Sequence, residues 1–245
     1  MAIVITHSNE PQAFIIKCKN LNTQLTCCVP NDIYMLMERL LLGWDIIKET
    51  CSPFDLNVGK VEKYSIHSRK YGLLGRSRDL VSSFNFLVNA IAYEILSRNP
   101  KFRLVHAAAF TDKTNVNIIL GGKKAGKSSF VSSKVGKFKR CIGDDLLLWD
   151  GNKTIIALGF PVRLRRPIDT NLIKKLGTNN LLVGRSLAFV NPNVLKQWPA
   201  GNANTINRFY LLREYRPQKI TFENGLSELK TRSIKLPSDQ TFITL

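Results

Sequence analysis

The sequence predicts a mixed α/β or α+β fold in which strands outnumber helices. The first observation is a glycine-bounded loop at residues 121–128, which follows an apolar stretch typical of a buried strand. The second is the segment 80–97, whose apolar residues recur at steps of three and four, as in an amphipathic helix. The third is a set of short apolar runs around the loop, which favours a mixed core over a regular doubly wound sheet.

The amino-terminal part contains short elements of both kinds. We expect strands at residues 2–6, 13–17 and 61–67, and helices at residues 33–42 and 80–97. The second helix should begin at Asp79, a good N-cap residue, and end before Pro100. A basic stretch rich in Gly and Ser at residues 70–79 indicates a boundary. We therefore predict an amino-terminal region, residues 1–75, that binds a substrate or partner, and a second domain, residues 76–245.

The carboxy-terminal part surrounds the loop with predicted strands. We expect strands at residues 103–110, 115–120, 141–149, 154–158, 207–215 and 219–222, and a short helix at residues 128–135. Turns should separate them at residues 111–114 and 150–152. A basic segment punctuated by proline follows at residues 161–168.

The composition excludes several classes of protein. Apolar residues make up 44% of the 245 residues, so a sizeable core can form and wholesale disorder is excluded. No apolar run reaches the length of about 18 residues that a transmembrane helix needs. The amino terminus lacks the basic residues and cleavage site of a signal peptide. We therefore expect a cytoplasmic protein without a membrane span.

The charge narrows the partners without naming one. Lys and Arg number 36 against 18 Asp and Glu, a formal net charge of +18, which attracts polyanions such as nucleotides, nucleic acid or acidic polypeptides. A merely solvated basic surface is the alternative. Nucleic acid is not favoured, because the basic residues are not interleaved with aromatic residues. The five cysteines form no C-x-x-C pair and the histidines lie far apart, so a structural metal is not expected.

The loop has the sequence of a phosphate-binding loop. It matches G-x-x-x-x-G-K-[ST] at every fixed position, between a predicted strand and a predicted helix. Glycines let the backbone turn its N–H groups toward a phosphate, Lys127 supplies a positive charge, and the Ser128 hydroxyl can bind Mg²⁺. The residues expected to bind ATP are Gly121, Gly122, Lys123, Lys124, Ala125, Gly126, Lys127, Ser128 and Ser129. Lys123 and Lys124 either are simply solvated or strengthen the positive field at the loop.

Two acidic residues and one histidine are the candidate catalytic groups. Asp144 and Asp145 stand at the head of an apolar segment, and adjacent strand residues face opposite sides, so one carboxylate should point toward the loop and the other away. A Mg²⁺–nucleotide site needs one carboxylate near its Ser ligand, and a kinase needs another beside the attacking hydroxyl. The alternative is an ordinary turn at the start of a strand. His106 alone is more typical of a histidine in the core.

In this order, the three elements resemble the catalytic domain of HPr kinase/phosphorylase and its relatives, whose fold is shared with phosphoenolpyruvate carboxykinase. The matching segments are residues 104–109, 121–129 and 142–146, followed by an Arg-Pro-Ile element at residues 159–168. The resemblance implies that Ser128 and Asp144 hold Mg²⁺, that Asp145 is the base, and that His106 lies near the γ-phosphate. The order of the two aspartates stays open. It also implies that Arg166, Arg163 or Arg165 stabilises charge in transit; Arg166 is the candidate we name.

The expected function is therefore ATP-dependent transfer of the γ-phosphate to a hydroxyl, with Lys127 among the catalytic groups. The acceptor class expected first is Ser or Thr of a protein or peptide, of acidic character to suit the basic surface. The alternatives are a small-molecule kinase, for example of free serine, and a catalytically silent nucleotide-binding regulator. Similar proteins often form homo-oligomers. The Arg-Gly-rich element linked to phosphorylase activity in the family is not visible here, so reversal by inorganic phosphate is not expected.

Overall fold

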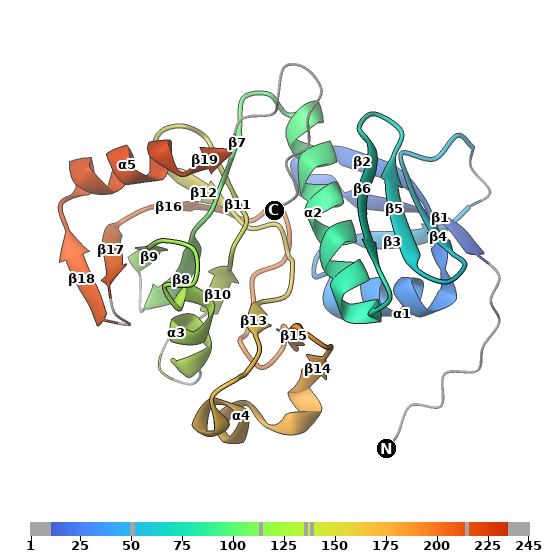
Figure 1. Ribbon diagram of the computed structural model, residues 1–245. Coiled ribbons are helices and arrows are strands. Elements are labelled where there is room, and N and C mark those ends of the chain that lie inside the picture. The colour runs from blue at the N-terminus through green and yellow to red at the C-terminus, as the bar shows by residue number, and fades with distance from the viewer. Residues whose placement is uncertain are drawn as a thin grey trace.

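Four β-sheets and five α-helices make up the part of the chain that the structure describes. The computed structural model describes residues 11–49, 52–112, 115–134, 137, 140–213 and 216–234. The predicted mixed α+β class is confirmed. Figure 1 shows the six-stranded sheet at one side, the long helix α2 beside it, and the other sheets beyond α2. The strand predicted at residues 2–6 lies outside the described residues.

The amino-terminal sheet is built entirely from residues before α2. Its strands run in the order β3-β1-β2-β4-β5-β6, with β2 and β4 parallel and the other neighbours antiparallel. Their bounds are β1 Pro11–Cys18, β2 Thr23–Pro30, β3 Asp45–Lys48, β4 Leu56–Lys60, β5 Tyr64–Ser68 and β6 Gly72–Ser77. The 3₁₀ helix Lys19–Leu21 and the helix α1 (Asn31–Leu40) complete this part. The strand expected at 61–67 begins three residues later, because residues 61–63 form the bend between β4 and β5.

Helix α2 (Leu80–Arg98) lies between this sheet and the rest of the molecule. It begins as expected, since a carboxylate oxygen of Asp79 accepts a hydrogen bond of 2.8 Å from the Ser82 backbone N–H. The helix is long and apolar enough to cross a membrane by length and composition, but 61% of its most apolar window is buried. Its side chains share one core with α1, with the sheet and with Leu104, Leu148 and Phe189 from later in the chain. This core crosses the predicted boundary at 70–79.

The predicted phosphate-binding loop follows a strand of a second, five-stranded sheet. The strand order is β10-β8-β9-β17-β18, with β9 and β17 parallel. Their bounds are β8 Ala108–Asp112, β9 Asn115–Leu120, β10 Arg140–Gly143, β17 Arg208–Arg213 and β18 Arg216–Ile220. Both faces are covered, because Ile118 and Leu120 pack in the core that includes helix α5 (Phe222–Thr231), whereas Ile119 packs in the core that includes helix α3 (Lys127–Ser133).

Two of the predicted strands are each split between two sheets. The strand expected at 103–110 is β7 (Arg103–Val105) and β8, interrupted at His106–Ala107; the strand expected at 141–149 is β10 and β11 (Leu147–Trp149), interrupted at Asp144–Asp145–Leu146. Strand β7 pairs with β11, and β8 pairs with β10, both antiparallel. The two segments, β7–β8 and β10–β11, therefore pass side by side from the second sheet into a third. Both predictions of a single strand were wrong, because an apolar run does not reveal a change of sheet.

The third and fourth sheets complete the fold. The third has the order β16-β12-β11-β7-β19, and the fourth has the order β13-β15-β14. The remaining strands are β12 Thr154–Ile156, β16 Ala203–Thr205, β19 Ser233–Ile234, β13 Arg163–Arg165, β14 Leu181–Val183 and β15 Leu187–Val190. Helix α4 (Thr170–Leu176), the 3₁₀ helix Thr178–Asn180 and α5 were not predicted from the sequence. The strand expected at 219–222 ends at Ile220, since Thr221 caps α5.

Candidate functional site

The loop lies between β9 and α3, as its sequence motif requires. Lys124 and Gly126 have φ angles of +68° and +88°, in the left-handed region, and Lys127 is the first residue of α3. Gly122, Lys123, Lys124 and Ser129 are exposed, whereas Ala125 and Ser128 are half-buried. The Nζ atom of Lys127 donates to the carbonyl oxygens of Gly121 and Gly122, at 3.0 and 3.2 Å. The loop thus holds its lysine folded back on its own first residues.

The surroundings of Lys127 disfavour the charged form of its ammonium group. Only 6% of the residue is exposed. Burial lowers the pKa of its ammonium group, and the positive charges of Arg232 and Arg163 act in the same direction. The carboxylates of Asp144 and Asp145 act against that shift. A bound anionic ligand would stabilise the charged lysine, because it would replace the water that burial has removed.

Asp144 is the carboxylate on the side of Lys127. It is 5% exposed, and within the described residues neither of its side-chain oxygens has a hydrogen-bond partner. Burial raises the pKa of this carboxyl, and the neighbouring charge of Asp145 raises it further. The Ser128 hydroxyl, Arg163 and Lys127 counteract that rise, although Ser128 does not complete a hydrogen bond of normal geometry. A buried carboxylate with both oxygens unpaired is costly and is typical of a site that a ligand completes.

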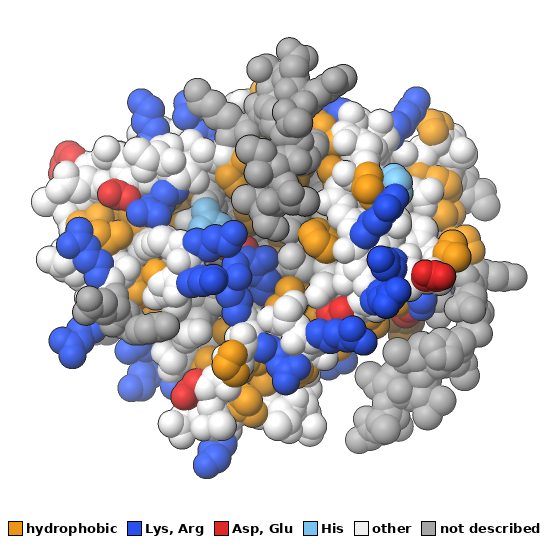
Figure 2. All heavy atoms as spheres, in the orientation of Figure 1, with side chains coloured by type: hydrophobic (Ala, Val, Ile, Leu, Met, Phe, Trp, Pro, Cys, Tyr) orange, Lys and Arg blue, Asp and Glu red, His pale blue; other side chains and the backbone are white. Residues whose placement is uncertain are grey.

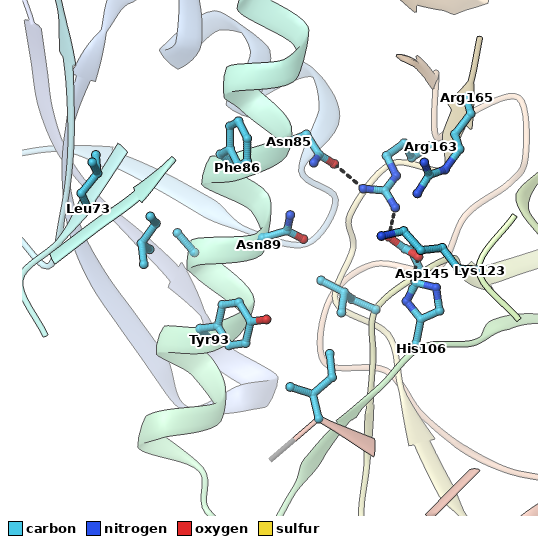
Figure 3. A pocket seen from close by; sticks show the side chains of 14 residues that line it. Leu73, Asn85, Phe86, Asn89, Tyr93, His106, Lys123, Asp145, Arg163 and Arg165 are labelled. Atoms are coloured by element: carbon cyan, nitrogen blue, oxygen red, sulfur yellow. Dashed lines mark hydrogen bonds and ion pairs between the residues drawn. The ribbon is translucent and has the colours of Figure 1, made fainter. Parts of the chain in front are cut away.

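Asp145, by contrast, is held by two neighbours. One oxygen accepts from Nδ1 of His106 at 2.9 Å, and the other accepts from Nη2 of Arg163. Arg163 in turn donates to the Asn85 side chain on α2 at 3.1 Å; Figure 3 draws this chain of contacts. Burial opposes ionisation of Asp145, but the hydrogen bond from His106 and the charge of Arg163 outweigh it and lower the pKa of this carboxyl.

The backbone separates the two carboxylates. Asp145 has a φ of +69°, in the left-handed region that few residues other than glycine adopt. Asp145 lies in a bend between β10 and β11. The two side chains are therefore not oriented by strand alternation, which was our expectation from the sequence. Their nearest partners nevertheless differ: Ser128 is the hydroxyl that acts on Asp144, whereas Asp145 contacts His106 and Arg163, and the charges of Arg163 and Lys127 act on both carboxylates. Strained backbone of this kind persists where the surrounding structure holds it, often at functional sites.

A cavity of about 450 Å³ opens beside Asp145. Its polar lining includes His106, Lys123, Asp145, Arg163 and Arg165. The opposite side comes from α2 and β6 and is mainly apolar; we call it the apolar wall, and it consists of Leu73, Leu74, Phe86, Ala90 and Tyr93. In Figure 3, Tyr93 on α2 lies opposite the polar residues, whereas Leu73 lies farther from them, on the strand beyond α2. Lys and Arg side chains also gather near the middle of this face of the molecule (Figure 2).

Two arginines differ from what the sequence led us to expect. Arg166 was the named candidate for stabilising charge, but its guanidinium donates to the carbonyl oxygens of Gly184 and Arg185, and Arg163 is the arginine that contacts Asp145. Arg232 was not predicted from the sequence. Its guanidinium donates to the Gly121 carbonyl at 3.0 Å and forms an ion pair with Glu228. No motif marks this residue, because it reaches the loop from the end of α5.

Comparison with known proteins gives no independent identification. No family model matches the chain, and no curated protein matches it significantly. The chemistry of the site therefore has to be argued from its own residues.

The donors at Asp144 fit a cation that arrives with a nucleotide. Within the described residues, no three His, Cys, Asp or Glu side chains form a group that could hold a metal ion by themselves. The unpaired carboxylate of Asp144 and the Ser128 hydroxyl are oxygen donors of the kind that Mg²⁺ prefers. Mg²⁺ in nucleotide sites takes much of its coordination from phosphate oxygens and water, so two protein donors beside a phosphate-binding loop are a suitable set.

Proposed function

We propose that this protein is an ATP-dependent kinase that transfers the γ-phosphate of ATP to a hydroxyl group. The observation that carries the proposal is the pair of carboxylates beside the loop motif: Asp144, buried and unpaired near Lys127, and Asp145, ionised and held by His106 and Arg163. A phosphoryl-transfer site needs one carboxylate on the metal side and one beside the attacking hydroxyl. This division supports the assignment of Asp145 as base and of Asp144, with Ser128, as metal ligand.

The proposed step is a direct displacement at phosphorus. The acceptor oxygen forms a bond to the γ-phosphorus while the bond to the oxygen bridging to the β-phosphate breaks, and ADP leaves with that electron pair. Asp145 accepts the hydroxyl proton, since its lowered pKa keeps it ionised before the reaction. His106 and Arg163 hold its two oxygens in place. Lys127 balances phosphate charge, and Mg²⁺ bound at Asp144 and Ser128 would neutralise the remainder.

The acceptor class that we propose first is Ser or Thr of a protein or peptide, as the sequence led us to expect. A small-molecule hydroxyl is the second candidate. The cavity beside Asp145 favours it, because about 450 Å³ lies within the range of roughly 300–1,000 Å³ typical of small-molecule sites.

Label transfer from γ-labelled ATP tests the proposal. The purified protein is incubated with labelled ATP and Mg²⁺, with a lysate of its source cells as the supply of acceptors. Lys127→Ala removes the charge at the phosphates, and Asp145→Asn removes the base while keeping the shape of the side chain. We expect label to appear on a polypeptide or metabolite with the unaltered protein and to be lost with both variants.

Matched controls separate these effects from general damage. Lys219→Ala on β18 and Asp45→Asn on β3 change the same residue types at exposed positions away from the loop, and both should retain transfer. Binding of a non-hydrolysable ATP analogue is measured in parallel. Nucleotide binding without label transfer to the lysate or to a panel of short peptides and alcohols would contradict the kinase proposal and favour a nucleotide-binding regulator.

A further inference from the structure

The cavity beside Asp145 is lined by charged residues and by apolar residues. Its polar side carries the carboxylate that we propose as base, and its apolar wall comes from a different sheet and helix. Leu73 of that wall is 43% exposed, although a leucine gains free energy when an apolar partner covers it. An apolar surface left open beside a charged group is typical of a binding site.

We propose that the apolar wall binds the body of the phosphate acceptor, so that the acceptor is an amphiphilic molecule with its hydroxyl next to a bulky apolar or aromatic group. This inference rests on the proposed kinase function and specifies its substrate class. The hydroxyl would lie at Asp145, and the apolar group would lie against Leu73, Phe86 and Tyr93.

The position of the cavity favours the acceptor over the nucleotide. In a direct transfer the base stands beside the attacking hydroxyl, at the end of the site that the acceptor enters. Asp145 and His106 line the cavity, whereas Lys127, Ser128 and Asp144 are not among its lining residues within the described part of the chain. The loop contributes Lys123 alone. The cavity therefore adjoins the base and the exposed Lys123 but not Lys127, Ser128 or Asp144, which is where an acceptor rather than the phosphates would lie.

Asn89 offers a way to orient the bound molecule. It lies on the same stripe of α2 as Phe86, Ala90 and Tyr93, and Figure 3 shows its amide directed toward the side that carries His106 and Asp145. Within the described residues the side-chain amide of Asn89 has no hydrogen-bond partner. The side chain of Asn85, one helical turn earlier, accepts a hydrogen bond from Arg163. A side-chain amide donates and accepts, so it can pair with a peptide group or with a second polar group of a small molecule.

Two pairs of acceptor probes test the inference and distinguish a peptide from a small molecule. The peptide pair is N-acetyl-phenylalanyl-serine amide and N-acetyl-glycyl-serine amide; the alcohol pair is benzyl alcohol and ethanol. We expect kcat/KM to be about tenfold or more higher for the aromatic member, since burying one large apolar group contributes that much discrimination. A preference in the peptide pair alone identifies a peptide acceptor, and a preference in the alcohol pair alone identifies a small molecule.

Variants of the wall tie this preference to the cavity. Leu73→Asp places a charge at an exposed position of the wall, and Tyr93→Ala removes an aromatic face; both should abolish most of the preference. Ile47→Asp is the matched control, because Ile47 is 40% exposed on β3 at the opposite edge of the same sheet, and it should retain the preference. Equal use of both members of each pair, or a preference that survives both wall variants, would overturn the proposal.

Binding measurements separate this inference from the kinase proposal. Saturation-transfer NMR detects probe binding in the presence of a non-hydrolysable ATP analogue, without any transfer. Binding of the aromatic probes that Leu73→Asp removes supports the wall even if no transfer occurs. Transfer without apolar preference supports the kinase and rejects the wall. Weaker binding of the ATP analogue to Leu73→Asp, with Ile47→Asp unaffected, would assign the wall to the nucleotide base and also reject the inference.

Discussion

The surroundings of Asp144 and of Asp145 differ in how completely neighbouring residues supply hydrogen bonds and ion pairs to the carboxylate. On the proposed phosphate side, Asp144 is buried and, within the described residues, both of its oxygens lack a hydrogen-bond partner and Lys127 donates only to carbonyl oxygens of its own loop. On the acceptor side, each oxygen of Asp145 has a partner, and the chain of contacts continues through Arg163 to Asn85. Neighbouring carboxylates thus have pKa values shifted in opposite directions.

This difference is what phosphoryl transfer requires of each side. The phosphate side must receive a ligand with several charges, so groups without partners there become satisfied when the ligand binds. The acceptor side must keep a base in one place before the reaction, so its hydrogen bonds are made in advance. The first side is incomplete without its ligand, and the second is preorganised.

The largest effect should come from neutralising the two carboxylates separately. Asp145→Asn should lower the rate of transfer about 10²–10⁴-fold and leave nucleotide affinity nearly unchanged, because asparagine keeps the shape and tolerates the left-handed backbone. Asp144→Asn should weaken Mg²⁺-dependent nucleotide binding instead. Single-turnover transfer and calorimetric titration with an ATP analogue measure the two quantities. Equal losses of nucleotide affinity in both variants would remove the distinction between the two sides.

A second prediction concerns Arg163 as the residue that positions Asp145. Arg163→Gln should lower transfer about tenfold, the equivalent of one charged hydrogen bond. The charge of Arg163 opposes the effect of burial and lowers the pKa of Asp145, so its removal raises that pKa and leaves the base protonated up to a higher pH. The acidic limb of the kcat/KM profile should therefore move to higher pH. Arg216→Gln, exposed on β18, should leave the profile in place.

A third prediction concerns Arg232 on the phosphate side. Arg232→Gln removes the hydrogen bond to the Gly121 carbonyl and should weaken nucleotide affinity about fivefold, without moving the acidic limb of the pH profile of transfer, which Asp145 sets. Glu228→Gln leaves Arg232 present but removes its ion pair. If the Glu228 variant binds nucleotide as well as the unaltered protein, the contact with Gly121 is the one that matters. A shift of the acidic limb in Arg232→Gln would place Arg232 on the acceptor side instead.

The smallest effect should appear at Glu94, a buried carboxyl away from the site. Burial raises its pKa, as does the charge of Asp55, while the Ser68 hydrogen bond and the charges of Arg98 and Lys70 act against that rise. The folded state therefore binds the proton more tightly than the unfolded chain, so stability is lost as the pH rises through the folded pKa.

Glu94→Gln should raise the free energy of unfolding by about 1 kcal/mol at neutral pH. The gain should disappear as the pH falls through the raised pKa, where Glu94 is protonated in the folded protein. Urea denaturation at neutral and mildly acidic pH measures it, with the exposed Glu62→Gln as control. A gain that is the same at both pH values would show that the charge is not its source, and Glu94 would then be no guide to the cost of burying Asp144.

Local patterns in the sequence predicted those parts of the molecule that depend on local physics. The phosphate-binding loop was placed between its strand and helix because glycine and lysine spacing is a property of one short segment. Helix α2 and its cap at Asp79 follow from periodicity and from one side chain. The roles of the loop and of the carboxylates remain proposals.

Nonlocal contacts explain what the sequence did not predict. The break at His106 lies inside an apolar run, so nothing local marks the change of sheet there; at Asp144 the two carboxylates indicated a turn, but not that the strand continues in another sheet. Arg163 and Arg165 lie two residues apart on β13 and both line the cavity, whereas Arg166 lies beyond the end of that strand. Strand alternation would have favoured the first two, had the bounds of β13 been known. The contact of Arg232 with the loop depends on where α5 ends, and no local pattern in the sequence gives that position.

The paired passage of β7–β8 and β10–β11 from one sheet to another has a mechanical consequence. His106 and Asp145 both lie where these two antiparallel segments pass from one sheet to the next, between the paired residues Val105 and Leu147 and the paired residues Ala109 and Gly143, so a movement of both segments together would carry both residues. The distance between His106 and Asp145 therefore depends on the pairing register of β7 with β11 and of β8 with β10. A residue inserted into only one of the chains would displace one partner and not the other, while matched insertions in both would let the pair move as a unit.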